Sequence, residues 1–327
     1  MFKGEKIFSG EVDVKYYFQK SYKKTDSLTI VFSAFPAMGK PPTYNFIRTL
    51  EEFDSNKLFI LDDFGCRASY YLCKNREYTI ERSVIKLINS IINEHEIKTI
   101  ISCGSSKGGY AALYYGIKYG FDYIISASPQ YLLGDYLLKQ TNSKAIVEFM
   151  SGSATEEDHT YLNEIMAKMI NNTTNKPNIF IHLGERENHY TNHVKPLLAD
   201  LDRCHINYTL DLGDYSNHSD VAQFFPQILK DKIRKILGFP SLKVSQSHVG
   251  TQPINSKCTF IVETDSQSNL VAWYIFHNNT RIDATNYSNN REYTIHFKEK
   301  GSYRVKAFII NEQGKKVSTF SEAIQVK

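Results

Sequence analysis

Short apolar runs alternate with helix-like segments along the first 238 residues of the chain. The runs are apolar throughout, which is typical of strands that are buried on both faces of a parallel sheet. They lie at residues 28–32 (LTIVF), 57–61 (KLFIL), 98–103 (KTIISC), 122–128, 178–183 (NIFIHL) and 207–212 (NYTLDL). Helical periodicity is found at 81–93, 110–119, 192–202 and 222–237. This alternation predicts an α/β domain in which helices cover both faces of a mostly parallel sheet.

Two further features belong to this first domain, residues 1–238. Residues 6–20 have the pattern of an antiparallel hairpin at its start. Between the runs at 122–128 and 178–183 the chain has helical character over a length that exceeds an ordinary crossover. We therefore expect a helical cap insertion at about 130–176, lying over an active site; two packing helices are the alternative.

The pattern changes after residue 238, so the chain is expected to contain a second, smaller domain. Residues 239–257 are polar and contain Gly, Pro, Ser and Gln, as a linker would. Residues 258–327 alternate in strand fashion between turn signals, which predicts a small all-β sandwich with Trp273 in its core. This last segment resembles the immunoglobulin-like module called a three-Y domain.

Composition excludes several classes of protein. Lysine and arginine number 39 against 35 acidic residues, so the formal charge of +4 is too small to indicate nucleic-acid binding. No apolar run is long enough to span a membrane, and the amino terminus lacks the apolar core of a signal peptide. The five cysteines form no CxxC pair. These observations predict a cytoplasmic protein without membrane insertion, a disulfide framework or a zinc site.

The most specific motif is GSSKGG at residues 104–109, which fits G-x-S-x-G with Ser106 at its centre. A buried strand precedes it and a helix follows it. In a nucleophile elbow the tight turn exposes the serine oxygen above the sheet, and the start of the helix favours the negative charge of an oxyanion. A phosphate-binding loop is the competing interpretation, but the P-loop spacing is absent. Ser106 is therefore the predicted nucleophile of an α/β-hydrolase fold.

A nucleophilic serine needs a base and an acid that orients the base. In α/β-hydrolases the acid follows a later strand, and the histidine follows the last one. Glu187 lies three residues after the glycine that ends the 178–183 segment, with Glu185 as the fallback. His218 follows the 207–212 segment. The order along the chain predicts a triad of Ser106, His218 and Glu187.

The oxyanion hole needs two N–H donors. One is the backbone N–H of Lys107, directly after the nucleophile, and the other is expected from Ala34 or Phe35 in the loop after the 28–32 strand. Pro36 has no N–H to offer.

A second polar cluster, DDFGCRASYY, follows the strand at 57–61. It is expected at the carboxyl ends of the strands, where open α/β sheets bind their ligands. Asp63, Arg67, Tyr70 and Tyr71 are predicted to bind substrate there, because such side chains suit sugar hydroxyls or an anionic group. A polar loop with packed tyrosines is the alternative.

The remaining histidines carry weaker signals. His189 and His193 are spaced to share one helical face, as two metal ligands would be, but no third ligand accompanies them. We expect an ordinary role on the surface or at the rim of the site, and no metal. His182, inside a strand, is expected to be a packed core residue.

Five segments of the sequence together resemble a known group of proteins: FSAFP, LFILDDFG, ISCGSSKGGYAALYYGI, IFIHLGEREN and DYSNHSDVAQFFPQIL. Over about residues 25–237 the chain is similar to bacterial α/β-hydrolase-fold proteins of surface-glycan pathways. They include XcbB/CpsF-type capsular polysaccharide proteins and the glycan O-acetyltransferase component of the accessory Sec system. The resemblance implies a catalytic site of Ser106, His218 and Glu187, although many hydrolases have Asp as the acid. In some members it implies O-acetylation of glycan hydroxyls.

The expected function is therefore serine-dependent acyl transfer, as an O-acetyltransferase or esterase acting on bacterial capsular or surface polysaccharide. No cofactor is expected beyond an acyl donor such as acetyl-CoA. Expected partners are the glycan itself and a homodimer or a glycan-biosynthesis complex. The alternatives are a catalytically silent scaffold that binds glycan or organises such a complex, and a serine peptidase.

Overall fold

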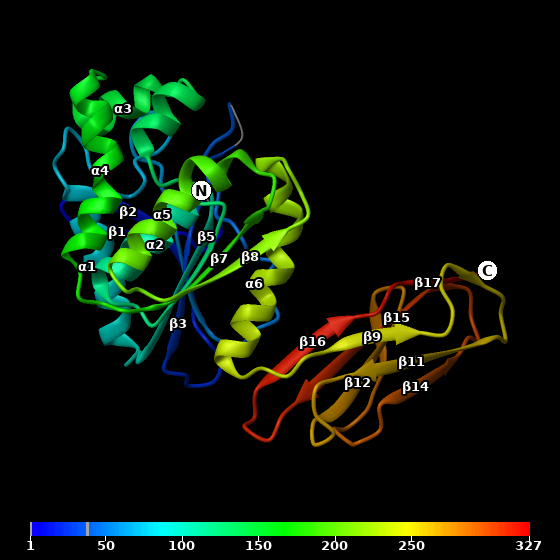
Figure 1. Cartoon of the computed structure of the whole chain (residues 1–327). Coiled ribbons are helices and arrows are strands. Elements are labelled where there is room, and N and C mark those ends of the chain that lie inside the picture. The colour runs from blue at the N-terminus through cyan, green and yellow to red at the C-terminus, as the bar shows by residue number, and fades with distance from the viewer. Residues whose placement is uncertain (1, 37–38) are drawn as a thin grey trace. The chain divides into compact units, whose positions relative to one another are not determined.

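The computed structural model describes residues 2–36 and 39–327, and its ribbon is shown in Figure 1. It divides into two compact units: residues 1–47 with 55–229, and residues 48–54 with 230–327. The strands of the first unit are β1 (Lys6–Ser9), β2 (Asp13–Gln19), β3 (Ser27–Phe32), β4 (Asn56–Ile60), β5 (Thr99–Ser105), β6 (Tyr123–Ala127), β7 (Asn178–Gly184) and β8 (Tyr208–Gly213). Its α-helices are α1 (Thr79–Glu94), α2 (Lys107–Tyr119), α3 (Lys144–Ser151), α4 (Glu156–Asn172) and α5 (Lys195–Arg203), and α6 (Val221–Leu237) begins in it.

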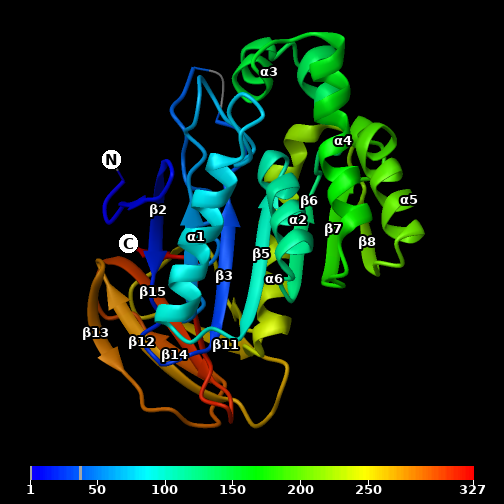
Figure 2. The ribbon, with the colours of Figure 1, turned by 90° about the vertical axis from the view of Figure 1, so that its left-hand side faces the viewer.

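One mixed sheet organises the first unit, with the strand order β1-β2-β4-β3-β5-β6-β7-β8. All neighbours from β4 to β8 pair in parallel, whereas β1–β2 and β2–β4 are antiparallel. Helices α1, α2, α4 and α5 lie along one face, and α6 begins on the other (Figure 2). The expected mostly parallel α/β sheet and the hairpin at its start are therefore confirmed.

Two helices begin at other residues than the sequence predicted, one at a pair of glycines and one at a π-helical turn. The helix expected from residue 110 begins at Lys107, directly after the GSSKGG serine, because the two glycines that disfavour a helix are packed inside the fold. The helix expected at 192–202 starts as a π-helical turn, Tyr190–Val194, before α5. Because β5, β6, β7 and β8 are parallel, their carboxyl ends share one edge of the sheet, where the connecting loops meet.

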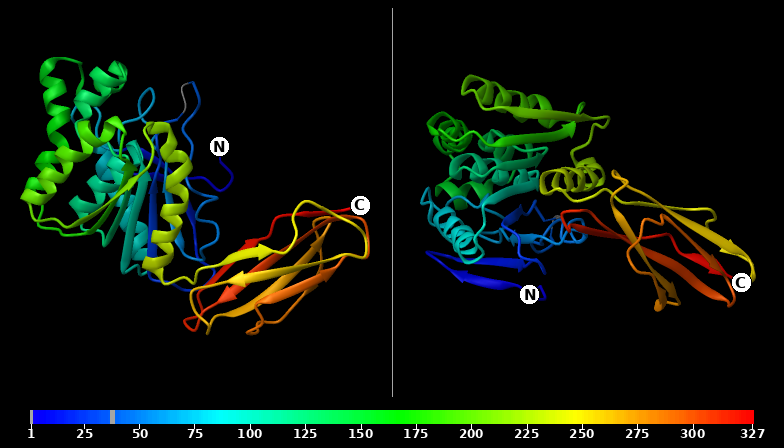
Figure 3. Two further views of the ribbon diagram at one scale, coloured as in Figure 1. Left: turned by 45° about the vertical axis from the view of Figure 1, so that its right-hand side comes forward. Right: turned by 90° about the horizontal axis from the view of Figure 1, so that it is seen from below.

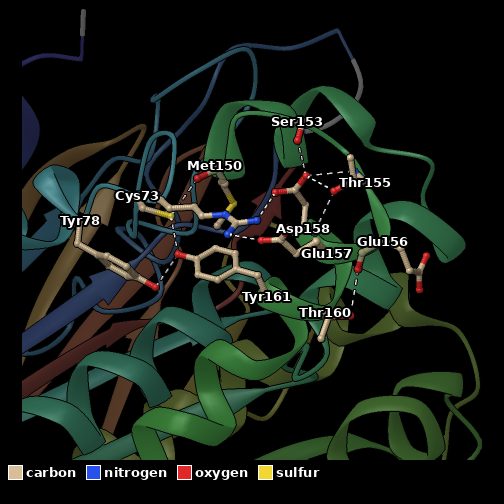
Figure 4. A network of polar contacts seen from close by, with 11 residues as sticks. Cys73, Tyr78, Met150, Ser153, Thr155, Glu156, Glu157, Asp158, Thr160 and Tyr161 are labelled. Atoms are coloured by element: carbon tan, nitrogen blue, oxygen red, sulfur yellow. Dashed lines mark hydrogen bonds and ion pairs between the residues drawn. The ribbon is translucent and has the colours of Figure 1, made fainter.

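The helical segment between β6 and β7 consists of a π-helical stretch, Asp135–Gln140, followed by α3 and α4. Helix α4 packs against α2 and α5. Its first turn is tied to the loop after β4: Asp158 Oδ1 accepts a 2.8 Å hydrogen bond from Arg76, and Asp158 Oδ2 accepts from Ser153 and from Thr155 (Figure 4). Thr155 and Asp158 form a capping box, which satisfies backbone N–H groups at the start of the helix.

This anchor predicts a pH-dependent contribution to stability. Burial alone would raise the pKa of Asp158, but hydrogen bonds from Ser153, Arg76 and Thr155 outweigh it and hold the pKa well below its usual range. A depressed carboxyl pKa stabilises the fold above the unfolded pKa of about 4 and loses that contribution as the pH falls further. We expect Asp158→Asn to lower the free energy of unfolding by about 1–2 kcal/mol at pH 7, and by less below about pH 4.

Chemical unfolding of both proteins between pH 3 and pH 7 measures this difference. The matched control is Glu157→Gln, because Glu157 pairs with the same Arg76 but its side chain is 79% exposed. The control substitution should lower the free energy of unfolding by less than about 0.5 kcal/mol. If the free energy of unfolding of Asp158→Asn differs from that of the wild type by the same amount at every pH from 3 to 7, the low pKa assigned to Asp158 is contradicted.

Apart from residues 48–54 and the end of α6, the second unit is built of strands and is called the all-β unit below. They are β9 (Lys243–Gln246), β10 (Thr251–Gln252), β11 (Lys257–Glu263), β12 (Leu270–His277), β13 (Thr280–Ala284), β14 (Glu292–His296), β15 (Gly301–Ile310), β16 (Lys316–Phe320) and β17 (Ile324–Val326). They form one sheet of order β10-β17-β15-β12-β13, with β16 on β15, and a second of order β14-β11-β9 (Figure 3). Trp273, 2% exposed, lies in the core as expected.

The linker predicted for residues 239–257 needs correction. Within it β9 pairs with β11, and β10 pairs with β17, so most of this stretch belongs to the all-β unit. Polar composition was misleading here, because strands at sheet edges carry polar side chains as readily as linkers do. Among the residues that the structure describes, no helix is long and apolar enough to cross a membrane.

Candidate active site

The site is centred on Ser106, which lies between the end of β5 and the start of α2. Its backbone has φ 53° and ψ −120°, a conformation that non-glycine residues rarely adopt. Two backbone hydrogen bonds hold the turn: the Ser106 N–H donates to Ala127 O at 2.8 Å, and the Tyr110 N–H donates to Ser106 O at 3.0 Å. The predicted strand–serine–helix turn is thus present, and the side chain lies at the carboxyl edge of the sheet.

Glycines flank the serine for a steric reason. A Cβ on Gly104 would lie 2.4 Å from the carbonyl carbon of Gly108. A Cβ on Gly108 would lie 2.3 Å from Phe32 O, at the end of β3. The turn can pack this closely against β3 only because both positions lack a side chain.

Three side chains from different loops form a continuous hydrogen-bond chain. The Ser106 Oγ lies 2.9 Å from His218 Nε2, although 112 residues separate them in sequence. On the other side of the ring, His218 Nδ1 lies 2.5 Å from Glu187 Oε1. His218 begins a short 3-10 turn after β8, and its side chain is 32% exposed. Such an arrangement can move the serine proton to the imidazole while the carboxylate holds the ring in one orientation.

The two candidate acids differ sharply in environment. Glu187 is 3% exposed, and its second carboxylate oxygen accepts hydrogen bonds from Ser128 Oγ at 2.9 Å and from the Gly184 N–H at 3.1 Å. Glu185 is exposed to solvent. Only Glu187 contacts His218, so the geometry separates the preferred acid from the fallback.

Gln130 and His189 also lie close to the serine and its histidine. The amide nitrogen of Gln130, a fully buried residue, lies 2.9 Å from Ser106 Oγ and 3.1 Å from His189 Nε2. Because an amide nitrogen only donates, His189 Nε2 accepts, and its proton lies on Nδ1. The His189 ring is stacked on the His218 ring, with centroids 4.0 Å apart and planes 9° from parallel. Burial, with the neighbouring histidines, lowers the pKa of His189 to about 2, so it stays neutral beside His218.

His193 has a structural position. It is fully buried, and its Nδ1 accepts from the backbone N–H groups of Tyr131 and Leu132 at 3.3 Å. The surface or rim role expected for His193 is therefore wrong. His189 is buried as well, at 6% exposed, with its ring stacked on His218. His182 is a packed core residue as expected.

A metal ion would need donors that converge. Ligand atoms of Glu187, His189 and His218 lie within 4.8 Å of one another. The two imidazoles are stacked, however, so their nitrogen lone pairs run parallel instead of meeting at one point. The arrangement suits two stacked rings that hydrogen-bond to Gln130, Glu187 and Ser106 better than a metal centre.

The predicted oxyanion donors come from the first residue of α2 and from the loop after β3. Lys107 is the first residue of α2, where backbone N–H groups have no partner within the helix. The Ala34 N–H donates to Asn45 Oδ1 at 2.8 Å and is therefore engaged. Of the two alternatives, this leaves Phe35 as the better candidate for the second donor.

The side chain of Lys107 has a separate role that the sequence did not indicate. Its ammonium is fully buried and lies 2.9 Å from Asp62 Oδ2, and Asp62 also accepts from the Ser69 N–H and hydroxyl. Burial lowers the pKa of Lys107, an effect that Asp62 opposes. This pair ties the turn at the nucleophile to the loop after β4.

The predicted substrate cluster is only partly at the surface. Tyr70 and Tyr71 are fully buried, and the Tyr71 hydroxyl bonds Ser33 and Ile60 within the core. The prediction that these two tyrosines bind substrate is wrong, because ring packing beneath the loop excludes them from solvent. Asp63 is paired with Lys15 at 2.5 Å, and Arg67 stacks 5.0 Å from the Phe35 ring centre.

Sequence reasoning missed Ser128, Gln130 and the contact of His189. A signal existed: Ser128 and Gln130 directly follow β6, which neighbours β5 in the sheet. Polar residues directly after a strand beside the nucleophile strand therefore belong among the candidates.

Comparison with known proteins finds similar solved structures but no matching sequence family. No family model matches the sequence, and no curated protein matches it significantly. Among solved structures, the chain is similar to the capsule O-acetyltransferase of Neisseria meningitidis serogroup A (25% identity, TM-score 0.59, covering 68% of this chain and 91% of that one). A point mutant of that enzyme in complex with CoA gives 25% identity and a TM-score of 0.61, covering 71% and 96%.

A more distant structure shares the fold alone. It is a fluorophosphonate-binding serine hydrolase of Staphylococcus aureus (14% identity, TM-score 0.52, covering 71% of this chain and 97% of that one). On this hydrolase-type sheet, the likeness to the two O-acetyltransferase structures gives the class of protein: the chain is an enzyme of the acyl-transfer kind.

Proposed function

We propose that the protein is a serine O-acyltransferase that acetylates hydroxyl groups of a bacterial capsular or surface polysaccharide. Ser106 is the nucleophile, His218 the general base and acid, and Glu187 the orienting carboxylate. The observation that carries the proposal is the unbroken hydrogen-bond chain from Ser106 Oγ through His218 to Glu187.

The reaction follows from this geometry in two halves. Ser106 Oγ attacks the carbonyl carbon of the acyl donor while its proton passes to His218 Nε2, and the Lys107 and Phe35 N–H groups stabilise the oxyanion. Collapse of the intermediate breaks the bond to the leaving group, which takes the proton from His218. An acceptor hydroxyl then loses its proton to His218 and attacks the acyl-serine, and collapse returns the proton to Ser106. Water in place of the acceptor would make the same site an esterase.

Acetyl-CoA is the proposed donor and a polysaccharide the proposed acceptor. The support is the likeness, at 25% identity, to a capsule O-acetyltransferase whose mutant structure contains CoA. The esterase-type neighbour is more distant, at 14% identity. In this proposal the all-β unit, residues 239–327, is an immunoglobulin-like module that accompanies the catalytic domain.

Acetyl transfer is tested with radiolabelled acetyl-CoA and a capsular polysaccharide whose esters have been removed by alkali. We expect label in the polymer that alkali releases again, at a rate above that of acetyl-CoA hydrolysis. Label that appears only as free acetate would identify an esterase. Neither product, together with no labelling of Ser106 by a fluorophosphonate, would indicate the silent scaffold.

Gln130 is proposed as a positioning residue for the nucleophile. Its amide donates to Ser106 Oγ at 2.9 Å and keeps His189 against His218. We expect Gln130→Leu to lower kcat by about 10- to 100-fold with little change in KM, because the serine oxygen loses a fixed partner.

The matched control is Gln140→Leu, since Gln140 contacts His193 and not the serine. Steady-state kinetics with p-nitrophenyl acetate measures both variants. Equal kcat for Gln130→Leu and the wild type would show that this contact has no part in turnover.

A further inference from the structure

The larger sheet of the all-β unit has one face that its core does not use. Along β15, Tyr303, Val305, Ala307 and Ile309 are buried, while the alternate residues point to the opposite face and are partly exposed. That opposite face, the cation–aromatic face, consists of Tyr274, Phe276, Arg281, Arg304, Lys306, Phe308, Lys316 and Phe320.

Strand register makes these side chains one continuous surface. Arg304 lies opposite Phe276 on β12, and Lys306 lies between Tyr274 on β12 and Phe320 on β16. The Arg304 guanidinium carbon is 4.2 Å from the Phe320 ring centre, and the Lys306 Nζ is 5.0 Å from that centre. The Arg281 guanidinium lies 4.7 Å from the Tyr274 ring. The rings therefore hold the cations in place through cation–π contacts.

The positive charge of this face is not neutralised. In the part of the chain that the structure describes, no salt bridge joins Arg281, Arg304, Lys306 or Lys316 to a carboxylate. The Arg304 Nε is buried without a hydrogen-bond partner among those residues. A β-bulge between Ile275 and Phe276 shifts the register, so Arg281 pairs with Phe276 while Asp283 pairs with Ile275, on the opposite face.

We propose that the cation–aromatic face binds an acidic polysaccharide, the acceptor chain of the reaction proposed above. Carboxylates or phosphodiesters of the polymer would pair with cations that are already held by rings, so little side-chain entropy is lost on binding. The arginine guanidinium donates paired N–H hydrogen bonds to the oxygens of either group. The ring of Phe320, which is 39% exposed, adds apolar surface for the carbon–hydrogen face of a sugar.

Affinity electrophoresis of the full-length protein tests this binding site. The probes are polysialic acid for carboxylates, a glycerol-phosphate teichoic acid for phosphodiesters, neutral dextran, and oligo(dT) for single-stranded nucleic acid. We expect the wild type to bind at least one acidic glycan and not dextran, with an affinity that falls as salt rises. The variant Arg304→Gln with Lys306→Gln should weaken binding by about tenfold or more.

The control carries the same change of charge elsewhere. Lys257 and Lys298 are exposed residues outside the cation–aromatic face, and their double replacement by Gln should alter binding less than about twofold. Circular dichroism checks the fold of each variant. Equal weakening by both double variants, no binding of either acidic glycan by the wild type, or tighter binding of oligo(dT) than of the glycans would overturn the proposal.

The binding proposal rests on the proposed function, but separate experiments test the binding of polysaccharide and the catalysis at Ser106. Hydrolysis of p-nitrophenyl acetate takes place at the Ser106 site, which includes no residue of the cation–aromatic face, and should be unchanged in the Arg304→Gln/Lys306→Gln variant. Ser106→Ala should bind the polymer as the wild type does. Loss of ester hydrolysis in the face variant would contradict the assignment of a separate binding surface.

Discussion

Replacing Ser106 by alanine is expected to lower kcat for acetyl-ester turnover by about four to six orders of magnitude. The variant loses the atom that forms the acyl-enzyme, while the oxyanion donors remain and leave a small residual rate. Ser106 is 8% exposed, and alanine differs from serine only by the loss of the hydroxyl group, so the fold should persist. Steady-state hydrolysis of p-nitrophenyl acetate measures the change.

Covalent labelling makes this experiment sharper. A fluorophosphonate should label the wild type at Ser106, and mass spectrometry locates the modified peptide. Ser105, the neighbour on β5, is the matched control: Ser105→Ala should leave both labelling and turnover within a fewfold of the wild type. Retained turnover in a folded Ser106→Ala protein would exclude the proposed nucleophile.

The second large effect is expected at the acid. Glu187→Gln keeps the shape of the side chain but removes the charge that faces His218 Nδ1, 2.5 Å away. An amide there favours the wrong imidazole tautomer and no longer stabilises the imidazolium, so kcat should fall by about 10³- to 10⁴-fold. Kinetics with the same ester measure it.

Glu185→Gln is the natural control for this variant. Glu185 lies two residues earlier and is exposed, so its replacement should change kcat by less than about threefold. A large loss in the Glu185 variant with full activity in the Glu187 variant would reverse the assignment of the acid.

Some of the site was predictable because it follows from chain order. Residues that directly follow parallel strands meet at the same sheet edge, so a serine after β5, a carboxylate after β7 and a histidine after β8 can be chosen from the sequence. Ser106, Glu187 and His218 were chosen in that way, and they lie within hydrogen-bond distance of one another. The preference for Glu187 over Glu185 used the same spacing argument.

Other residues were misjudged because sequence periodicity does not report burial within a loop. Tyr70 and Tyr71 follow a strand just as a ligand-binding loop would, yet both backbones have positive φ and both rings turn into the core. Gln130 was missed because it belongs to no motif, and His189 was considered only for a role on the surface or at the rim of the site. Gln130 reaches Ser106, and His189 reaches Gln130 and His218, only because the segment after β6 and the turn after β7 fold over the same edge of the sheet.

The sequence by itself determined the kind of fold and the order of its chemical groups. Buried strands need continuous apolar runs, and a tight strand–helix turn needs small residues around its serine. Tertiary structure alone decided which polar side chains are withdrawn from solvent and which cations share a face with aromatic rings. Those outcomes depend on contacts between residues far apart in the chain, and local composition and spacing do not encode such distances.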